Sequence, residues 1–181
     1  MSHQIAGVGL AAVAGAALDV PPATGAVMLG TAWLGSILPD ADRGGTRVYH
    51  RTRLERRVWI AGALGWVARL PLRLLTVLPH RGVTHSVLAC VAASVITGLL
   101  VALVDPALAV AAGAGMAIGY GTHIAGDACT PSGVAALAPA SRRRFWLLPR
   151  AARIPTGSLR EYALTVLIAA GLLAATFALT G

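Results

Sequence analysis

The sequence predicts an all-α membrane protein: one domain over residues 1–181, built as a bundle of about five spanning helices plus an interfacial or re-entrant helix pair. Of its 181 residues, 56% are hydrophobic and only 12% are charged, whereas soluble domains carry about 25% charged residues. The mean hydropathy is +0.72. Long apolar runs alternate with short polar turns, which is typical of a polytopic membrane protein rather than of a large soluble core.

The elements follow from where the apolar runs begin and end. The chain divides into a helical hairpin at 5–38, an Arg-rich loop with interfacial helices at 39–79, a second hairpin at 80–127, a basic loop at 128–160 and a last span at 162–180. Pro21 and Pro22 mark the tip of the first hairpin, because proline removes a backbone donor and stops a helix. Asp105 and Pro106 form the turn of the second hairpin. The first apolar run is short for an upright crossing of roughly 20 residues.

The apolar segment 58–78 is expected not to cross the membrane. It contains Arg69, Pro71 and Arg73, and an arginine at mid-bilayer costs about 2.5–3.5 kcal/mol. We therefore expect an interfacial or re-entrant helix pair, broken near Pro71.

The charge distribution predicts an orientation. All 15 basic residues are arginines, and the formal net charge is +8 with a pI near 11.2. A basic pI is also typical of nucleic-acid-binding proteins. If 58–78 does not cross, however, every arginine lies on one side of the membrane or in the interfacial segment, and the positive-inside rule makes that side cytoplasmic. We therefore expect a multi-pass protein of the cytoplasmic membrane, with lipid rather than nucleic acid as its partner. No basic segment precedes the first apolar run, so we expect no cleaved signal peptide.

The same topology gathers histidines and acids at the cytoplasmic face. Seven such residues come from separated segments: His3, Asp40, Asp42, His80, His85, His123 and Asp127. Ionisable residues at membrane helix ends are costly unless they are paired or functional, so this gathering favours a metal site. Mixed nitrogen and oxygen donors suit Zn, Mn or Fe better than Ca or Mg. We expect a divalent metal, zinc first, with manganese or iron as alternatives.

Each of these residues also has a simpler interpretation. His123 and Asp127 are four residues apart and project from one helix face, where they either share a cation or only form a helix-stabilising hydrogen bond. Asp40 and Asp42 follow a helix end, and either ligate a metal or terminate the helix. His3 is either a ligand or a solvated terminal residue. The turn acids, and Glu161 with them, are expected to be surface residues. Cys90 and Cys129 are expected to be reduced, because two cysteines make no disulfide framework.

Three sequence blocks carry a family resemblance. They read ILPDAD at 37–42, HRGVTHS at 80–86 and GYGTHIAGDACTPSGV at 119–134. In the same order they resemble the signature blocks of a bacterial family of inner-membrane, metal-dependent hydrolases, some of whose members are under LexA control. Met1-Ser2-His3 resembles the N-terminal histidine block of that family. The His-x3-Asp element is also similar, more weakly, to zinc-dependent phospholipase C and P1 nuclease. The Arg-rich insert between the first two blocks departs from the family pattern and leaves substrate and partner open.

The resemblance implies a metal centre and a reaction class. The implied ligands are His3, Asp40, His85, His123 and Asp127, with Asp42 and His80 close by. We expect hydrolysis, of a phosphoester such as a lipid phosphate or phospholipid, in which the metal activates water and polarises the ester.

Other residues have expected roles around that centre. Either Asp42 or His80 would be the general base, and Arg81 would neutralise developing negative charge unless it is merely another cytoplasmic arginine. Thr84, Ser86 and Thr130 would orient the ligands, with Ser86 also starting a helix. Juxtamembrane arginines attract anionic headgroups at about 1 kcal/mol each, so an anionic, lipid-like substrate is expected.

Two other functions fit parts of the sequence. The metal site is structural or sensory if protein ligands fill the whole coordination sphere, whereas an open position favours catalysis. Alternatively, the Arg-rich stretches 43–57 and 142–160 dock nucleic acid or protein, which steep salt dependence of binding would indicate.

Overall fold

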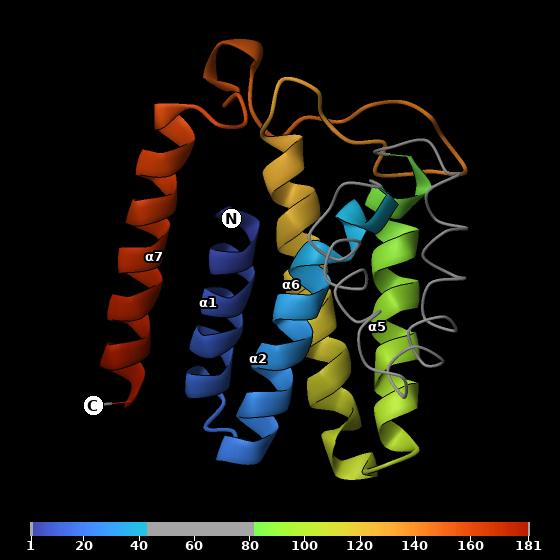
Figure 1. Ribbon diagram of the computed structural model, residues 1–181, viewed down its shortest axis with the longest axis vertical. Helices are drawn as coiled ribbons and strands as arrows, with labels where there is room; N and C mark the ends of the chain where they lie inside the picture. The colour runs from blue at the N-terminus through green and yellow to red at the C-terminus, as the bar shows by residue number, and fades with distance from the viewer. Residues whose placement is uncertain (1, 43–81, 181) are drawn as a thin grey trace, which may run out of the picture.

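A computed structural model describes residues 2–42 and 82–180. Five α-helices account for most of these residues: α1 (Ser2–Ala17), α2 (Pro22–Ile37), α5 (Val87–Ala102), α6 (Ala109–Ala128) and α7 (Leu159–Thr180). They run side by side in one bundle (Figure 1). The described residues contain no strand beyond an isolated bridge between Val134 and Phe145. The all-α prediction is therefore confirmed for this part of the chain.

Short turns join α1 to α2 and α5 to α6, and local sequence explains these turns. Pro22 is the first residue of α2, where its missing N–H costs nothing. Asp105 accepts a hydrogen bond from the Ala107 amide before the short 3-10 helix η4 (Pro106–Leu108). Ser86 accepts one from the Ala89 amide and caps α5. The prediction that Ser86 starts this helix is confirmed.

Helix α6 lies at the centre of the bundle and packs against α1, α2 and α5. Its contact with α2 depends on small residues. A Cβ at Gly115 would overlap the Met28 carbonyl, and one at Gly119 would overlap the Ala32 carbonyl. The two glycines are four residues apart, the spacing that lets apolar helices approach closely in lipid. This close approach brings the end of α2 next to the end of α6.

Two of the described helical segments are long and apolar enough to cross a membrane: Pro106–Ala128 and Leu159–Thr180. Helices α1, α2 and α5 have 16 residues each. At about 1.5 Å per residue they reach ~24 Å, less than the ~30 Å of a hydrocarbon core. The expectation of five spanning helices is therefore not supported. The proposed interfacial pair at 58–78 lies outside the described residues.

Helix α7 begins three residues before the predicted start at 162. Ser158 and Glu161 have the Ser-x-x-Glu spacing of a helix start, and the Ser158 hydroxyl accepts a hydrogen bond from the Glu161 amide at 3.3 Å. The sequence prediction placed the start later because the turn Leu159–Glu161 is polar and precedes the apolar run.

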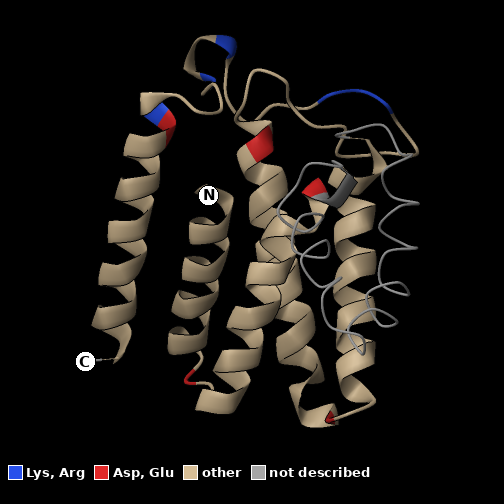
Figure 2. Cartoon of the chain, viewed as in Figure 1, with Lys and Arg blue, Asp and Glu red and all other residues tan. Residues whose placement is uncertain are grey.

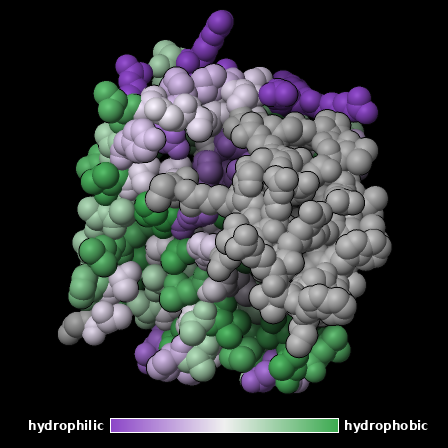
Figure 3. Space-filling view, viewed as in Figure 1, coloured by the Kyte–Doolittle hydropathy of each residue, from purple (hydrophilic) through white to green (hydrophobic). Residues whose placement is uncertain are grey.

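The two ends of the bundle differ in charge. The described arginines lie in the connection between α6 and α7 and in the first turn of α7, all at the upper end of the view in Figure 2. At the lower end are the two hairpin turns, which carry Asp19 and Asp105. Where the visible face is formed by described residues, many hydrophobic side chains lie along its body, and hydrophilic residues lie at its upper end and, in smaller number, at its lower end (Figure 3).

Candidate metal centre

Helix α6 supplies two buried candidate ligands at the upper end of the bundle, His123 and Asp127. The exposed fraction of His123 is 1% and that of Asp127 is 3%. They lie on the face of α6 that packs against its neighbours, as the i, i+4 spacing predicts. The His123 Nε2 is 3.9 Å from the Asp127 Oδ2, which is too long for a hydrogen bond. The pair is therefore not the simple helix-stabilising contact that was the alternative.

The backbone of α2 fixes the proton of His123. The His123 Nδ1 lies 2.7 Å from the Ser36 carbonyl oxygen, which can only accept, so Nδ1 must donate. In the neutral imidazole, Nε2 then carries a lone pair. This Nε2 is buried, has no hydrogen-bond partner among the described residues, and lies within 4 Å of carboxylate oxygens of Asp40 and Asp127. A lone pair facing two carboxylates is unfavourable unless a cation lies between them.

His85 is the last residue of a short 3-10 helix, η3 (Val83–His85), which positions it in the cluster. The side chain is fully buried. Its Nδ1 lies 3.1 Å from the Thr84 hydroxyl, and the Tyr120 hydroxyl of α6 donates to the Thr84 carbonyl. These contacts hold the ring so that its Nε2 points to Asp127 Oδ2 at 3.4 Å and to Asp40 Oδ1 at 3.7 Å.

Asp40 comes from the 3-10 helix η1 (Pro39–Asp42) that follows α2. Its Oδ1 is 3.7 Å from the His85 Nε2 and 3.8 Å from the His123 Nε2. Its side chain is 38% exposed, in contrast to the buried side chains it faces. Asp40 therefore marks the accessible side of the cluster.

His3 approaches the opposite oxygen of Asp127. Its Nε2 is 3.7 Å from Asp127 Oδ1, and its ring centroid is 4.6 Å from that of His123. Burial lowers the pKa of His3 to about 4, so the imidazole is neutral at neutral pH, the form that binds metals. A Cβ at Gly126 would overlap the His3 ring, so the glycine is needed for this position.

The spacing of the five side chains fits a metal ion. In five histidine–carboxylate pairs among them, the nitrogen and oxygen atoms are 3.4–3.9 Å apart. Two ligands at about 2.1 Å from a tetrahedral zinc lie ~3.4 Å apart, so modest inward movement would complete coordination. Two sets of three residues could each hold an ion, because the ligand atoms within each set lie within 4.8 Å of one another. One set is formed by His3, His123 and Asp127, and the other by Asp40, His85 and His123. His123 belongs to both sets, and Asp127 contacts both, because its Oδ1 faces His3 and its Oδ2 faces His85 and His123.

Two other expected supporting residues, Thr130 and Ser86, contact backbone carbonyls close to the cluster. The Thr130 hydroxyl donates to the Asp127 carbonyl at 2.7 Å, at the end of α6. Ser86 donates to the Val83 carbonyl at 2.7 Å and so closes η3. Burial raises the pKa of the Cys129 thiol. Cys90 and Cys129 are both free thiols.

Three expected catalytic residues cannot be placed. His80 and Arg81 lie outside the described residues, and for Asp42 only the backbone, in η1, is described. Their roles stay predictions.

Sequence reasoning missed three residues that position the site. The Ser36 carbonyl is a backbone group and gives no side-chain signal. Tyr120 precedes His123 by one helical turn, so its place on the same face of α6 could have indicated its role. Glu161 was expected to be a surface acid, but it accepts hydrogen bonds from the Ser2 hydroxyl and the Gly157 amide, both at 2.6 Å.

Comparison with known proteins decides the family. The model of the YdjM inner membrane protein family matches residues 1–180. The chain belongs to this family. No curated protein and no solved structure matches it. The family description indicates a membrane protein, in agreement with the two long apolar helical segments found among the described residues, and it says nothing of catalysis.

Proposed function

We propose that the protein is a metal-dependent hydrolase of the inner membrane that acts on a phosphoester. The observation that carries the proposal is the buried Nε2 of His123, which faces two carboxylates while the Ser36 carbonyl holds the proton on Nδ1. This arrangement supports a cation between the carboxylates. The donor set of three imidazoles and two carboxylates favours zinc, with manganese or iron as alternatives.

Different residues would have different roles in such a site. Asp40, His85, His123 and Asp127 would hold the ion, with His3 at the second oxygen of Asp127. A divalent cation supplies Lewis-acid chemistry: it lowers the pKa of water and polarises a phosphoryl oxygen. Water adds to phosphorus, the ester P–O bond breaks, and the products are an alcohol and a phosphate. Asp42 or His80 would accept the proton from water, and Arg81 would stabilise the charge on the phosphoryl oxygens.

The charge distribution supports a multi-pass topology with this site at the cytoplasmic face. If α6 and α7 both cross, the connection between them lies on one side, and it carries Arg142, Arg143, Arg144, Arg150 and Arg153. By the positive-inside rule that side is cytoplasmic. The same arginines favour an anionic, lipid-like substrate.

Metal analysis tests the proposal. The purified full chain, dialysed against a trace of zinc, is expected to retain metal, and His85→Ala and His123→Ala are expected to lose it. Asp105→Ala, in the turn at the other end of the bundle, is the control and should retain it. The proposal fails if wild type holds no more metal than the histidine variants. Phospholipids, polyprenyl phosphates and nucleotides are then compared as substrates.

A structural metal site is the second candidate. It is favoured by the near-complete burial of His85, His123 and Asp127, because closed coordination spheres are typical of structural zinc. A metal-loaded protein that hydrolyses none of these esters, but unfolds when a chelator removes the metal, would support this candidate instead.

A further inference from the structure

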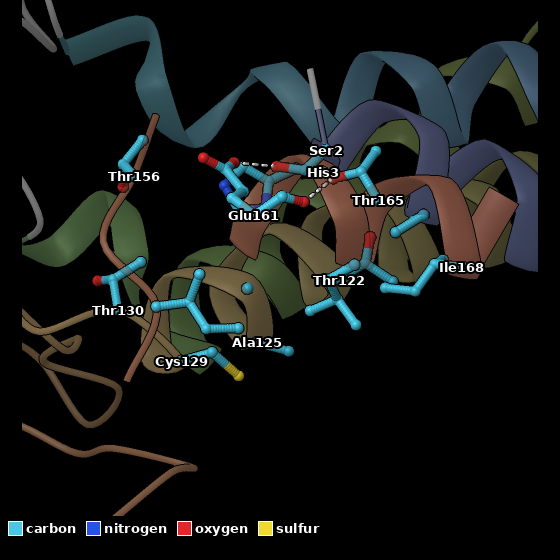
Figure 4. A pocket seen from close by; sticks show the side chains of 14 residues that line it. Ser2, His3, Thr122, Ala125, Cys129, Thr130, Thr156, Glu161, Thr165 and Ile168 are labelled. Atoms are coloured by element: carbon cyan, nitrogen blue, oxygen red, sulfur yellow. Dashed lines mark hydrogen bonds between the residues drawn. The ribbon is translucent and has the colours of Figure 1, made fainter. Parts of the chain in front are cut away.

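A cavity of about 290 Å³ lies beside the cluster, between α1, α6, α7 and the segment 154–156. Figure 4 shows its lining side chains, which come from these separate parts of the chain. His3 belongs to both sites, because its ring lines the cavity while its Nε2 approaches Asp127. The cavity therefore begins where the metal cluster ends.

The two ends of the cavity differ in polarity. At the upper end of α7 the lining includes Ser2, His3 and Glu161. One to two turns further along α7, Leu164 and Ile168 line it. The polar end is thus at the level of the cluster, and the apolar end extends along the bodies of the helices.

The hydroxyl groups deeper in the cavity do not make it polar. The Thr122 hydroxyl donates to the Ile118 and Gly119 carbonyls, both at 2.9 Å, and the Thr165 hydroxyl donates to the Glu161 carbonyl at 2.7 Å. Because each hydroxyl already donates its proton within its own helix, neither threonine has a free donor for a polar ligand. The deep wall suits hydrocarbon.

We propose that this cavity binds the single apolar chain of an amphiphilic phosphate, with the phosphate group at the metal cluster. The inference rests on the proposed function and names its substrate class. The volume lies at the lower limit of ligand pockets, about 300 Å³, so the cavity suits one short or medium alkyl or acyl chain rather than the two chains of a diacyl lipid. Continuity through His3 places the scissile group of such a substrate beside Asp127.

Binding of n-alkyl phosphonates to the zinc-loaded full chain tests the inference. Phosphonates of two, six and ten carbons differ only in chain length and are not hydrolysed. The affinity of wild type is expected to rise with chain length, by up to about fourfold per methylene that enters the cavity. An affinity that does not depend on chain length overturns the inference.

Matched variants locate the chain. Thr165→Phe fills the cavity, whereas Val166→Phe adds the same ring at a neighbouring position that is 68% exposed and does not line it. Thr165→Phe should weaken the ten-carbon phosphonate at least tenfold and leave the two-carbon phosphonate and the metal content unchanged. Val166→Phe should match wild type. Partition into detergent is the same for all three proteins, so it cancels in the comparison.

Two further measurements keep the test decisive. Ala6→Leu fills the cavity from α1, and it should repeat the Thr165→Phe result even if that variant folds poorly. Retained chain-length dependence in the folded filling variants overturns the inference. Decanol, which has the ten-carbon chain but no phosphonate group, separates the two proposals. If decanol and the ten-carbon phosphonate bind with equal affinity and the protein holds no metal, the proposed hydrolase function fails. The binding site for the apolar chain then still stands. If phosphonates bind to metal without chain dependence, the chain site fails and the hydrolase function stands.

Discussion

Helices α6 and α7 are both long and apolar enough to cross a membrane, yet they differ in almost every other respect. The candidate span that contains α6 has a mean hydropathy of 1.3 and 39% of it is buried, whereas the candidate span formed by α7 has a mean hydropathy of 2.2 and none of it is buried. Helix α6 carries His123 and Asp127, and α7 exposes Leu167 and Phe177. The less hydrophobic helix is the one that is shielded by protein.

This difference follows from what each helix contacts. Three helices surround α6, so glycine, histidine and aspartate on its faces meet protein rather than lipid. Helix α7 packs mainly against α1 and presents its other faces outward. In this bundle, the lower hydropathy of a membrane-length helix goes with a central position, where protein rather than lipid surrounds its polar residues. Four experiments test this contrast.

The largest effect is expected for Asp127→Asn on α6. The carboxylate faces His3 with one oxygen and His85 and His123 with the other, so its loss removes charge from both histidine groups. Metal affinity, measured by competition with a chelator, should fall more than ~100-fold, beyond the 10–100-fold typical of residues that only support ligands. Asp19→Asn, in the turn at the other end, is the control. Equal affinities would exclude Asp127 as a ligand.

The next largest effect is expected when the stability changes caused by one glycine substitution in α6 and one in α7 are compared. Gly119→Ala on α6 would push a Cβ into the Ala32 carbonyl, and overpacking of this kind costs about 1–3 kcal/mol. Gly171→Ala on α7 meets nothing within 4 Å, and should be neutral or stabilise by up to about 1 kcal/mol through helix propensity. Thermal unfolding in detergent measures both. Similar destabilisation by the two variants would contradict the different packing of the two helices.

A smaller effect is expected for Gly126→Ala. The new Cβ would displace the His3 ring, and metal affinity should fall roughly tenfold while the fold is retained. Gly121→Ala on the same helix is the matched control, since nothing lies within 4 Å of its Cβ. If Gly126→Ala binds metal as tightly as Gly121→Ala, His3 does not contribute to the centre.

The smallest effect is expected for Leu167→Ala on α7. The side chain is 69% exposed, so its truncation leaves no cavity and should change the free energy of unfolding by no more than about 0.5 kcal/mol. Denaturation in mixed detergent micelles measures this change. A loss above ~2 kcal/mol would mean that another protein surface covers α7.

Much of the site could be predicted from the sequence because topology alone places helix ends. Once the chain forms hairpins with turns at Asp19 and Asp105, His3, Asp40, His85 and Asp127 must lie at the same end of the bundle. The i, i+4 spacing of His123 and Asp127 also fixes their common face. These predictions depend only on helix periodicity and turn chemistry, which are local properties of the sequence.

The remaining features depend on contacts that no local pattern encodes. The hydrogen bond from His123 to the Ser36 carbonyl requires a particular rotation of α6 against α2, and the contact between Ser2 and Glu161 joins residues 159 positions apart. The cavity exists because side chains of three helices leave space between them. Only two of the described segments are long and apolar enough to support the expectation of about five spanning helices, because apolar composition alone does not measure helix length.

The ligands are also spread along the chain in a way that bears on biosynthesis. Asp127 is synthesised more than a hundred residues after His3, whereas the described part of α7 contributes no residue to the candidate centre. Chains are generally folded as they emerge, amino-terminal parts first. Under the proposed function, helices α1 and α2 would therefore be made before the α6 residues that complete the centre, and metal capture would follow the synthesis of α6.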